Sequence, residues 1–343
     1  MSIQYIMNAK IYKDLMSTAI LIALLTYFLI PLAFKYYIPL SRRLIFLNTI
    51  HWPPFVNFNF PDKLGLLGTQ NYNINVGQNI TIGLWHTLPE DMLPLYKKDT
   101  HSYNYLNSGH PIILYLHGNA GTRAGWHRIM LYKILSKMNF HIISFDYRGF
   151  GDSIGTPTEK GVLDDAKYVY SWIKHHSGNN PIILWGHSLG SGVTTKLARF
   201  LNDNEAYKPA AVILEAPFTN IEEAASRHPF SRIYRYFPWF TGCFLEPLRR
   251  NKIYFKSDIN VKYIDSPLLI MHAKDDNVVP YELGYKLHQI AKESKKDSNI
   301  PVIFSSFEAK LKLGHKHIHS APDLPDIIRK FMDTHVLNKI KGY

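Results

Sequence analysis

The chain has 343 residues, 46% of them hydrophobic and 19% charged, which is the composition of a folded protein and excludes a disordered or fibrous one. Its formal net charge of +12 is compatible with an ordinary solvated basic surface or with attraction to anionic lipid. The sequence contains no nucleic-acid-binding module, so we expect no nucleic-acid partner, and its single cysteine excludes a network of internal disulfides.

An uncharged run covers residues 15–34 near the N-terminus. As an α-helix this run would be about 30 Å long, which is the thickness of the hydrocarbon core of a membrane. It is too long for the apolar part of a signal peptide, and it is apolar all round, unlike a buried amphipathic helix. We therefore predict a short tail at 1–14, a transmembrane signal anchor at 15–34 and a membrane-proximal linker at 35–70.

The charges that flank the run do not decide its orientation, because positive residues stand on both sides in similar numbers. Asn79 begins the only Asn-x-Ser/Thr triplet of the chain and is therefore the candidate glycosylation site. A glycosylated Asn79 would place the body of the protein in a lumen.

Residues 71–88 alternate apolar and polar side chains around residues 76–79, which predicts a β-hairpin. From about residue 110, apolar runs alternate with helical patterns, which predicts an α/β fold with a mostly parallel, doubly wound sheet. The predicted strands are 112–116, 141–145, 182–185, 211–214, 268–271 and 302–307, and the predicted helices are 122–138, 158–177, 191–204, 281–296 and 324–339. Residues 219–263 interrupt this alternation, and we predict that they form a cap within a catalytic domain spanning 71–343.

Gly186-His187-Ser188-Leu189-Gly190 follows one of the predicted strands and precedes a predicted helix. A G-x-S-x-G motif in this position is typical of a nucleophile elbow, the tight turn that exposes a serine above a parallel sheet. The motif predicts an α/β-hydrolase fold with Ser188 as the nucleophile.

An α/β-hydrolase also needs an acid and then a histidine further along the chain. The predicted strand 268–271 leads into His272-Ala273-Lys274-Asp275-Asp276-Asn277-Val278-Val279-Pro280. Asp276 stands where such enzymes place the acid in the pattern H-G-x-x-D-x-x-V-P, and Asp275 is the alternative.

Three histidines follow the last predicted strand, in Gly314-His315-Lys316-His317-Ile318-His319. The Gly-His pair before the last helix favours His315 as the general base, with His317 as the alternative. A metal site in this loop would need carboxylate or cysteine ligands that are not nearby, so we predict no metal.

The oxyanion produced by attack on an ester needs backbone N–H donors. One should come from Leu189, directly after the nucleophile, and the second from the loop after an early strand. That loop, His117-Gly118-Asn119-Ala120-Gly121, favours Asn119 as the donor and leaves Ala120 as the alternative. We expect residues 146–153 to brace this loop from beneath.

The cap holds many aromatic side chains, which either form a small core or line a pocket for an acyl chain. Tyr234 and Phe237 are the candidate substrate-binding residues of the cap. His187 is a third candidate, although it fits a packed core histidine equally well.

With these residues in place, the chain resembles the membrane-anchored α/β-hydrolase domain-containing (ABHD) lipases. The segments that carry the resemblance are HGNAGTRAGWHR (117–128), SFDYRGFGDSIGTPTEKG (144–161), WGHSLGSGV (185–193), EAPFTNIEEAASRHPFSRIYRYFP (215–238), HAKDDNVVP (272–280) and GHKHIHSAPDLP (314–325). The resemblance implies a catalytic triad of Ser188, Asp276 and His315. It also implies a protein of the endoplasmic-reticulum membrane with a lumenal catalytic domain.

We therefore expect a single-pass membrane serine hydrolase that cleaves the acyl ester of single-chain lipids, without a cofactor. The resemblance implies lysophosphatidylserine or monoacylglycerol as substrate. An acyl-protein thioesterase and a non-catalytic lipid-binding protein are the alternatives. No sequence feature indicates an oligomeric state.

Overall fold

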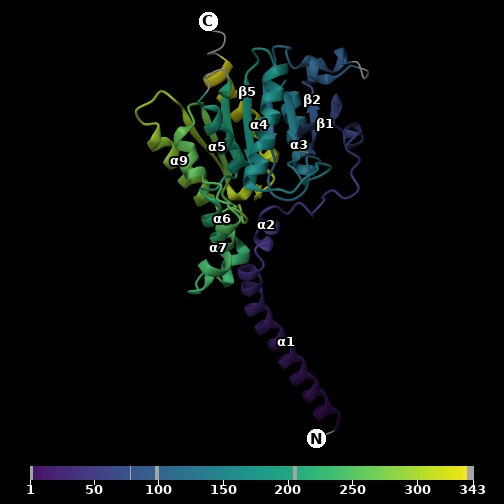
Figure 1. The fold of residues 1–343 in the computed structure, drawn as a ribbon, viewed down its shortest axis with the longest axis vertical. Coiled ribbons are helices and arrows are strands. Elements are labelled where there is room, and N and C mark those ends of the chain that lie inside the picture. The colour runs from purple at the N-terminus through teal and green to yellow at the C-terminus, as the bar shows by residue number, and fades with distance from the viewer. Residues whose placement is uncertain (1–2, 78, 97–99, 204–206, 338–343) are drawn as a thin grey trace.

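The fold is built on one eight-stranded sheet in which β3 to β8 run parallel and β1 and β2 form an antiparallel edge (Figure 1). The computed structural model describes residues 3–77, 79–96, 100–203 and 207–337. The strand order is β1-β2-β4-β3-β5-β6-β7-β8. The strands are β1 Thr69–Gly77, β2 Ile80–Thr87, β3 Ile112–Leu116, β4 His141–Phe145, β5 Ile182–His187, β6 Ala211–Glu215, β7 Leu268–Ala273 and β8 Val302–Phe307.

Helices cover both faces of this sheet, as the predicted doubly wound fold requires. The helices of the catalytic body are α3 Trp126–Lys137, α4 Glu159–His176, α5 Leu189–Leu201, α9 Tyr281–Ser294 and α10 Leu324–Met332. Side chains alternate along each strand. In β3, Ile112 and Leu114 join the core under α4, α5 and α9, whereas Ile113 and Tyr115 join the core under α3 and α10.

The six strands predicted after residue 110 are confirmed, and the predicted hairpin is present as β1 and β2, with Gln78 of its turn outside the described residues. The helices differ at their ends. Residues 122–125 form a turn before α3, and α5 begins two residues earlier than predicted, at Leu189. Asn204 and residues 338–339, at the predicted ends of two helices, also lie outside the described residues.

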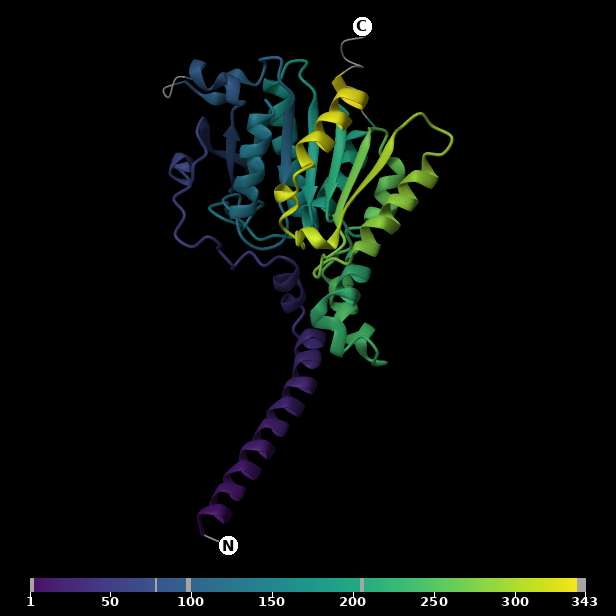
Figure 2. The same cartoon turned by 180° about the vertical axis from the view of Figure 1, so that it is seen from behind.

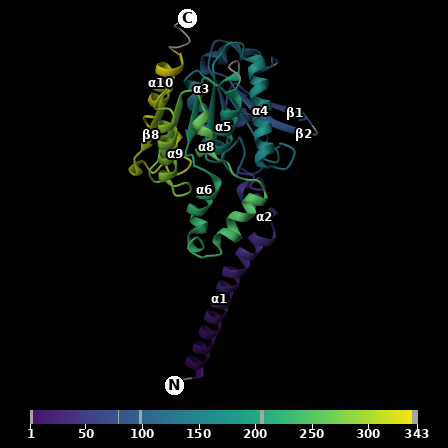
Figure 3. The same cartoon turned by 60° about the vertical axis from the view of Figure 1, so that its left-hand side comes forward.

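Short helices and turns fill the chain between β6 and β7, where the cap is predicted. They are α6 Ile221–Arg227, η5 Pro229–Ile233, η6 Thr241–Leu245, α7 Glu246–Arg250 and α8 Ser257–Asn260. Figure 3 shows α6 and the neighbouring green segments beyond the edge of the sheet, beside the first two helices of the chain. This edge is the carboxyl edge of the parallel strands, where ligands bind in open α/β sheets.

The first helix, α1, covers Ile3–Tyr36, and its N-terminal part projects from the body of the molecule (Figures 1 and 2). It begins well inside the segment 1–14 predicted as a tail, because residues 3–14 contain neither proline nor glycine to interrupt a helix. Its part Met7–Tyr36 is long and apolar enough to cross a membrane, and only 6% of its most apolar window is buried. A core helix of a soluble domain would be mostly buried, so the exposure favours a membrane helix.

Residues 35–70, predicted as a linker, are packed along the catalytic domain. After α2, Pro39–Ile45, the Asn48 side chain donates to the Gly149 oxygen at 3.0 Å. Further along, the Phe58 oxygen accepts a hydrogen bond of 2.9 Å from the indole of Trp85. These contacts hold this segment against the catalytic domain.

Candidate active site

Ser188 lies on the turn between β5 and α5 with φ of 52° and ψ of −120°, a backbone conformation that a side-chain-bearing residue adopts only under strain. Its amide donates to the Glu215 oxygen of β6 at 2.9 Å, which holds the turn in place. The strain belongs to the nucleophile elbow and turns the hydroxyl of Ser188 out of the sheet edge.

The glycines around Ser188 are required by close backbone approach. A Cβ atom on Gly190 would lie 2.0 Å from the Leu116 oxygen, and one on Gly186 would lie 2.2 Å from the Thr194 hydroxyl. A Cβ on Gly118 of the neighbouring loop would lie 3.1 Å from the Cβ of Ser188. Any larger residue would therefore push apart the two strands or the loop that meet at the nucleophile.

The structure brings together the three residues predicted as a triad. His315 Nε2 lies 2.8 Å from Ser188 Oγ, and His315 Nδ1 lies 2.7 Å from Asp276 Oδ2. Because the carboxylate accepts the Nδ1 proton, Nε2 presents its lone pair to the serine hydroxyl. This arrangement can deprotonate Ser188 during attack on a carbonyl.

Asp276 is held by four donors. Its Oδ1 accepts from the amides of Val278 and Val279 at 2.8 and 2.9 Å, and its Oδ2 accepts from His272 Nε2 at 3.2 Å as well as from His315. Burial raises the pKa of Asp276, but the hydrogen bonds from His272 and His315 outweigh burial and bring the pKa below its usual range. Asp276 is therefore ionised at neutral pH.

His272 was given no role by the sequence patterns. It is fully buried at the end of β7, and its Nε2 is shared between Asp276 and the Val279 oxygen at 2.9 Å. Gly284 of α9 makes room for it, since a Cβ there would lie 2.1 Å from His272 Nδ1. Its place at the start of the nine-residue segment 272–280, which also supplies Asp276, was the only sequence signal.

Asp275 and His317, the alternatives for the acid and the base, lie outside the series Ser188–His315–Asp276. Asp275 accepts a hydrogen bond of 3.0 Å from the Gly314 amide and so shapes the loop before His315. His317 is exposed and stacks edge-on against His319, with ring centroids 5.6 Å apart. Among the described residues, no group of three or more histidine, cysteine, aspartate or glutamate side chains could hold a metal ion.

The loop between β3 and α3 is organised by Arg128, which is 2% exposed. Its guanidinium donates to the oxygens of Gly118, Ala120 and Thr122, at 3.2 and 2.8 Å for the first two. In a trans peptide the N–H points opposite to the C=O, so the Asn119 amide points away from Arg128. The Ala120 amide is instead occupied by the Asn119 side chain at 2.9 Å, which favours Asn119 over Ala120 as an oxyanion donor.

Leu189 is the first residue of α5, where helix geometry leaves N–H groups without an intrahelical acceptor. Its amide therefore remains available on the same side of Ser188 as the helix N-terminus. The segment 146–153 contacts the oxyanion loop and the residues after it: the Tyr147 hydroxyl donates to the His117 oxygen at 3.2 Å, and Asp146 accepts from both the amide and the guanidinium of Arg123 at 2.6 Å.

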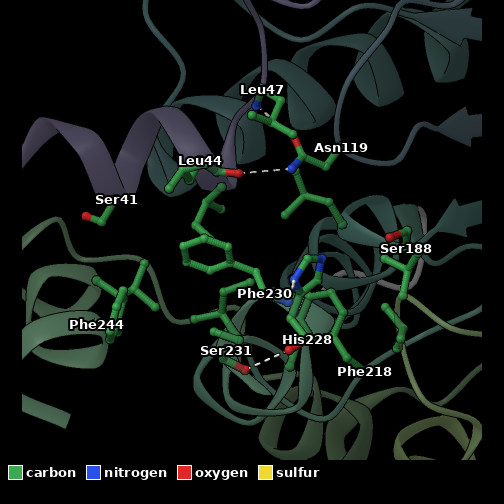
Figure 4. A pocket seen from close by; sticks show the side chains of 18 of the residues that line it. Ser41, Leu44, Leu47, Asn119, Ser188, Phe218, His228, Phe230, Ser231 and Phe244 are labelled. Carbon is green, nitrogen blue, oxygen red and sulfur yellow. Dashed lines mark hydrogen bonds between the residues drawn. The ribbon is translucent and has the colours of Figure 1, made fainter. Parts of the chain in front are cut away.

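Ser188 opens into an apolar cavity of about 350 Å³, a volume within the range of small-ligand pockets (Figure 4). Phe218, Phe230, Phe240 and Phe244 form the wall on the cap side. The opposite wall comes from the N-terminal segment, and its residues are Phe34, Ser41, Leu44, Ile45 and Leu47. Asn119 ties the N-terminal wall to the loop after β3, since its side chain accepts from the Leu47 amide at 2.8 Å and donates to the Leu44 oxygen at 3.2 Å.

The predicted substrate-binding residues do not line this cavity in the described part of the chain. His187 is 2% exposed and donates through Nε2 to the His315 oxygen at 2.8 Å, so it supports the base from below. Tyr234 and Phe237 pack against Tyr27 of α1, with ring centroids 5.8 and 5.4 Å away. A role of these three in substrate binding stays a prediction, and their distance from the lining reflects that sequence spacing does not show which face of a cap turns toward the sheet.

Comparisons with known proteins bear on the fold and the relatives of this chain. A family model described as the alpha/beta hydrolase fold matches residues 111–206. Lysophosphatidylserine lipase ABHD12 of Bos taurus is 49% identical over 308 residues, covering 89% of this chain and 77% of the relative. The protein of the same name from Gallus gallus is 48% identical, and the match covers 81% of that relative. Human Protein ABHD12B is 45% identical over 260 residues, which cover 75% of this chain and 71% of the relative.

Among solved structures, the Pyrococcus furiosus esterase Pf2001 superposes with a TM-score of 0.60 at 18% identity, covering 84% of this chain and 98% of its own. Est1E from Butyrivibrio proteoclasticus, with ferulic acid bound, gives a TM-score of 0.57 at 16% identity, covering 77% and 98%. At these identities the likeness shows the fold, which confirms the predicted α/β-hydrolase class.

Proposed function

This chain belongs to the family of the lysophosphatidylserine lipases ABHD12, and from that membership we propose that it hydrolyses the acyl ester of lysophosphatidylserine with Ser188 as the nucleophile. The relatives and the fold make it an ester hydrolase. The observation that carries the assignment of residues is the hydrogen-bonded series Ser188–His315–Asp276, which ends at the floor of an apolar cavity.

In the first step, Ser188 Oγ forms a bond to the ester carbonyl carbon while its proton passes to His315 Nε2. Asp276 stabilises the imidazolium that results. The amides of Leu189 and Asn119 donate to the oxyanion. The bond from the carbonyl carbon to the glycerol oxygen then breaks, and that oxygen takes the proton from His315 as the lysolipid head group leaves.

In the second step, the oxygen of a water molecule forms a bond to the carbonyl carbon of the acyl group on Ser188, and the bond from that carbon to Ser188 Oγ breaks. A proton of the water passes to His315 Nε2 and from there to Ser188 Oγ, so that a fatty acid leaves and the serine is restored. None of these steps needs a cofactor. The cavity supports a single acyl chain as the bound part of the substrate, because its lining is almost entirely apolar. Monoacylglycerol shares that chain and is a second substrate in this proposal.

The proposal places the enzyme in the endoplasmic-reticulum membrane, anchored by α1, with the catalytic domain in the lumen. The length, apolarity and exposure of α1 support the anchor. Asn79 is exposed on the turn between β1 and β2, so it is accessible for the glycosylation that a lumenal domain would receive.

The test is fatty-acid release by membranes that contain the protein or its Ser188→Ala variant. Lysophosphatidylserine, lysophosphatidylcholine and monoacylglycerol form the panel, and Ser294→Ala, at the exposed end of α9, is the matched control. We expect release that is highest with lysophosphatidylserine, lost in Ser188→Ala and unchanged in Ser294→Ala. Release that persists in Ser188→Ala would remove the proposed nucleophile, and absence of release from all three lipids would leave a thioesterase or a lipid-binding protein.

A further inference from the structure

The cap does not stop at the end of the apolar helix but packs along its side. Tyr27 of α1 contacts Tyr234, Phe237 and Trp239, with ring centroids 5.8, 5.4 and 5.9 Å away. Nearer the C-terminus of the same helix, the ring centroid of Phe34 lies 4.8 Å from that of Phe244. Figure 3 shows the cap and the upper part of α1 side by side.

These contacts fix the depth of the cap relative to a membrane. Tyr27 precedes Phe34, the last residue of the uncharged run, by seven positions, which is about 10 Å along a helix. If the run 15–34 fills the hydrocarbon core, the residues packed on Tyr27 lie below the surface of that core. Raising them out of the membrane would draw Lys10, Lys13 and Asp14 into it, and charged side chains are costly there.

The outer surface of the cap suits this position. In the cap tip, residues 229–239, the apolar side chains of Phe230, Ile233, Tyr236 and Phe237 are 46, 62, 78 and 41% exposed. Arg235 donates to the hydroxyl of Tyr236 at 2.8 Å, and its guanidinium lies over the ring. Exposed aliphatic and aromatic groups beside arginines are the composition of a surface held at the boundary between lipid head groups and acyl chains.

The cavity extends from the catalytic domain toward the cap tip and the end of the uncharged run. It extends from Ser188 at the sheet edge to Phe34 at the end of the uncharged run, and Phe230 of the cap tip lies 6.1 Å from the ring of Phe34. Leu44 and Phe230 line the cavity and are also exposed, so they form its rim. This rim therefore lies beside the cap tip and the end of the uncharged run.

We propose that the cap tip inserts into the leaflet next to the catalytic domain, and that the cavity opens into that leaflet so that the acyl chain reaches Ser188 without leaving the membrane. The insertion rests on α1 and the cap tip alone. The path of the acyl chain rests, in addition, on the proposed function.

Insertion is tested on the full chain in liposomes with an environment-sensitive fluorophore on a single cysteine. Ile233→Cys and Tyr236→Cys carry the label in a Cys243→Ala background, and Tyr168→Cys on α4, also exposed, is the matched control. We expect lipids with a spin label near the head group to quench the two cap labels, and iodide in the buffer to quench only the control. Cap labels that behave like the Tyr168 label would overturn the insertion.

The path of the acyl chain is tested with the double variant Ile233→Asp/Tyr236→Asp, since neither residue lines the cavity. We expect kcat/KM for lysophosphatidylserine in vesicles to fall at least tenfold, while hydrolysis of a short-chain ester dissolved in water is unchanged. Equal rates on vesicles would overturn delivery from the leaflet. The fluorescence experiment can be repeated in Ser188→Ala, so failure of the proposed function would leave its result intact.

Discussion

The Asp276 oxygens accept hydrogen bonds from two histidines and two backbone amides, and only one of those histidines, His315, also contacts Ser188. His272 Nε2 shares Oδ2 with His315, so it limits the rotation of the carboxylate that orients the base. A residue that acts in this way affects the rate of the chemical step and leaves substrate affinity alone.

We therefore expect His272→Ala to lower kcat about tenfold or more, because a lost hydrogen bond to a charged group is worth about 1.5–3 kcal/mol. KM for lysophosphatidylserine should stay the same. His272→Gln, which retains an N–H donor, should recover part of the rate. Initial rates on solubilised protein measure both effects, and a rise in KM with constant kcat would assign His272 to substrate binding instead.

Glu215 is a second buried ionisable group beneath the elbow, and its partner is the indole of Trp185 at 2.9 Å. Burial raises the pKa of Glu215 from 4.5 to about 7. Between these two values the unfolded chain loses a proton that the folded chain keeps. The contribution of Glu215 to the free energy of unfolding therefore decreases as pH rises from about 4.5 to about 7, by about 3 kcal/mol, and this contribution is constant above.

Glu215→Gln keeps an acceptor for Trp185 and removes the charge. We expect it to unfold at a higher temperature than the original chain at pH 8 and at the same temperature near pH 4.5. Thermal unfolding in detergent at the two pH values measures the difference, with Glu282→Gln on the exposed side of α9 as control. An equal shift at both pH values would show that charge burial is not the cause.

For single residues, the motifs predicted Ser188, Asp276 and His315, because each lies in a short sequence pattern that follows the end of a strand. They could not predict His272 or Glu215 as partners of the site. Their roles depend on which side chains of neighbouring strands and helices meet in the core, and a local pattern does not contain that information.

At the scale of elements, the oxyanion loop depends on a helix that follows it. Arg128, in the first turn of α3, binds the oxygens of Gly118, Ala120 and Thr122 and thereby turns the Asn119 amide away from itself. The loop sequence indicates the Asn119 amide as the donor. It does not indicate that Arg128 orients this amide, because a buried arginine in a helix cannot be distinguished from an exposed one by sequence.

We expect Arg128→Lys to lower kcat about tenfold to a hundredfold, since a lysine cannot reach three carbonyl oxygens and one oxyanion donor is worth about 10²–10³ in kcat. Arg329→Lys, at an exposed pair on α10, should have no effect and is the control. Labelling of Ser188 by a fluorophosphonate reports whether the elbow remains intact. A variant with full kcat would show that the loop holds its shape without Arg128.

The chain after α1 is joined to the same loop by the Asn119 side chain. Asn119→Ala retains the backbone donor and removes the contacts with Leu44 and Leu47. We expect it to hydrolyse a short soluble ester at nearly the original rate, and to lose several-fold in kcat/KM with a long acyl chain because one cavity wall is released. A parallel loss on both esters would mean that the side chain serves the oxyanion site itself.

At the scale of the whole molecule, the carboxyl edge of the sheet, the cap and α1 lie in that order along the long axis (Figure 1). The sequence patterns predicted the sheet, the cap and the apolar helix separately. They did not predict that residues 35–70 and the cap would together enclose the cavity, because neither segment has a regular period that shows which face is buried.

The central claim is that Ser188 accepts the acyl group of a lysolipid. Its most direct test is to quench the reaction with lysophosphatidylserine within a few turnovers and to analyse the peptide that contains Ser188 by mass spectrometry. We predict that this peptide gains the mass of the substrate's acyl chain in the original protein and not in Ser188→Ala. Release of fatty acid with the acyl group on another residue, such as Cys243, or on none, would contradict the account.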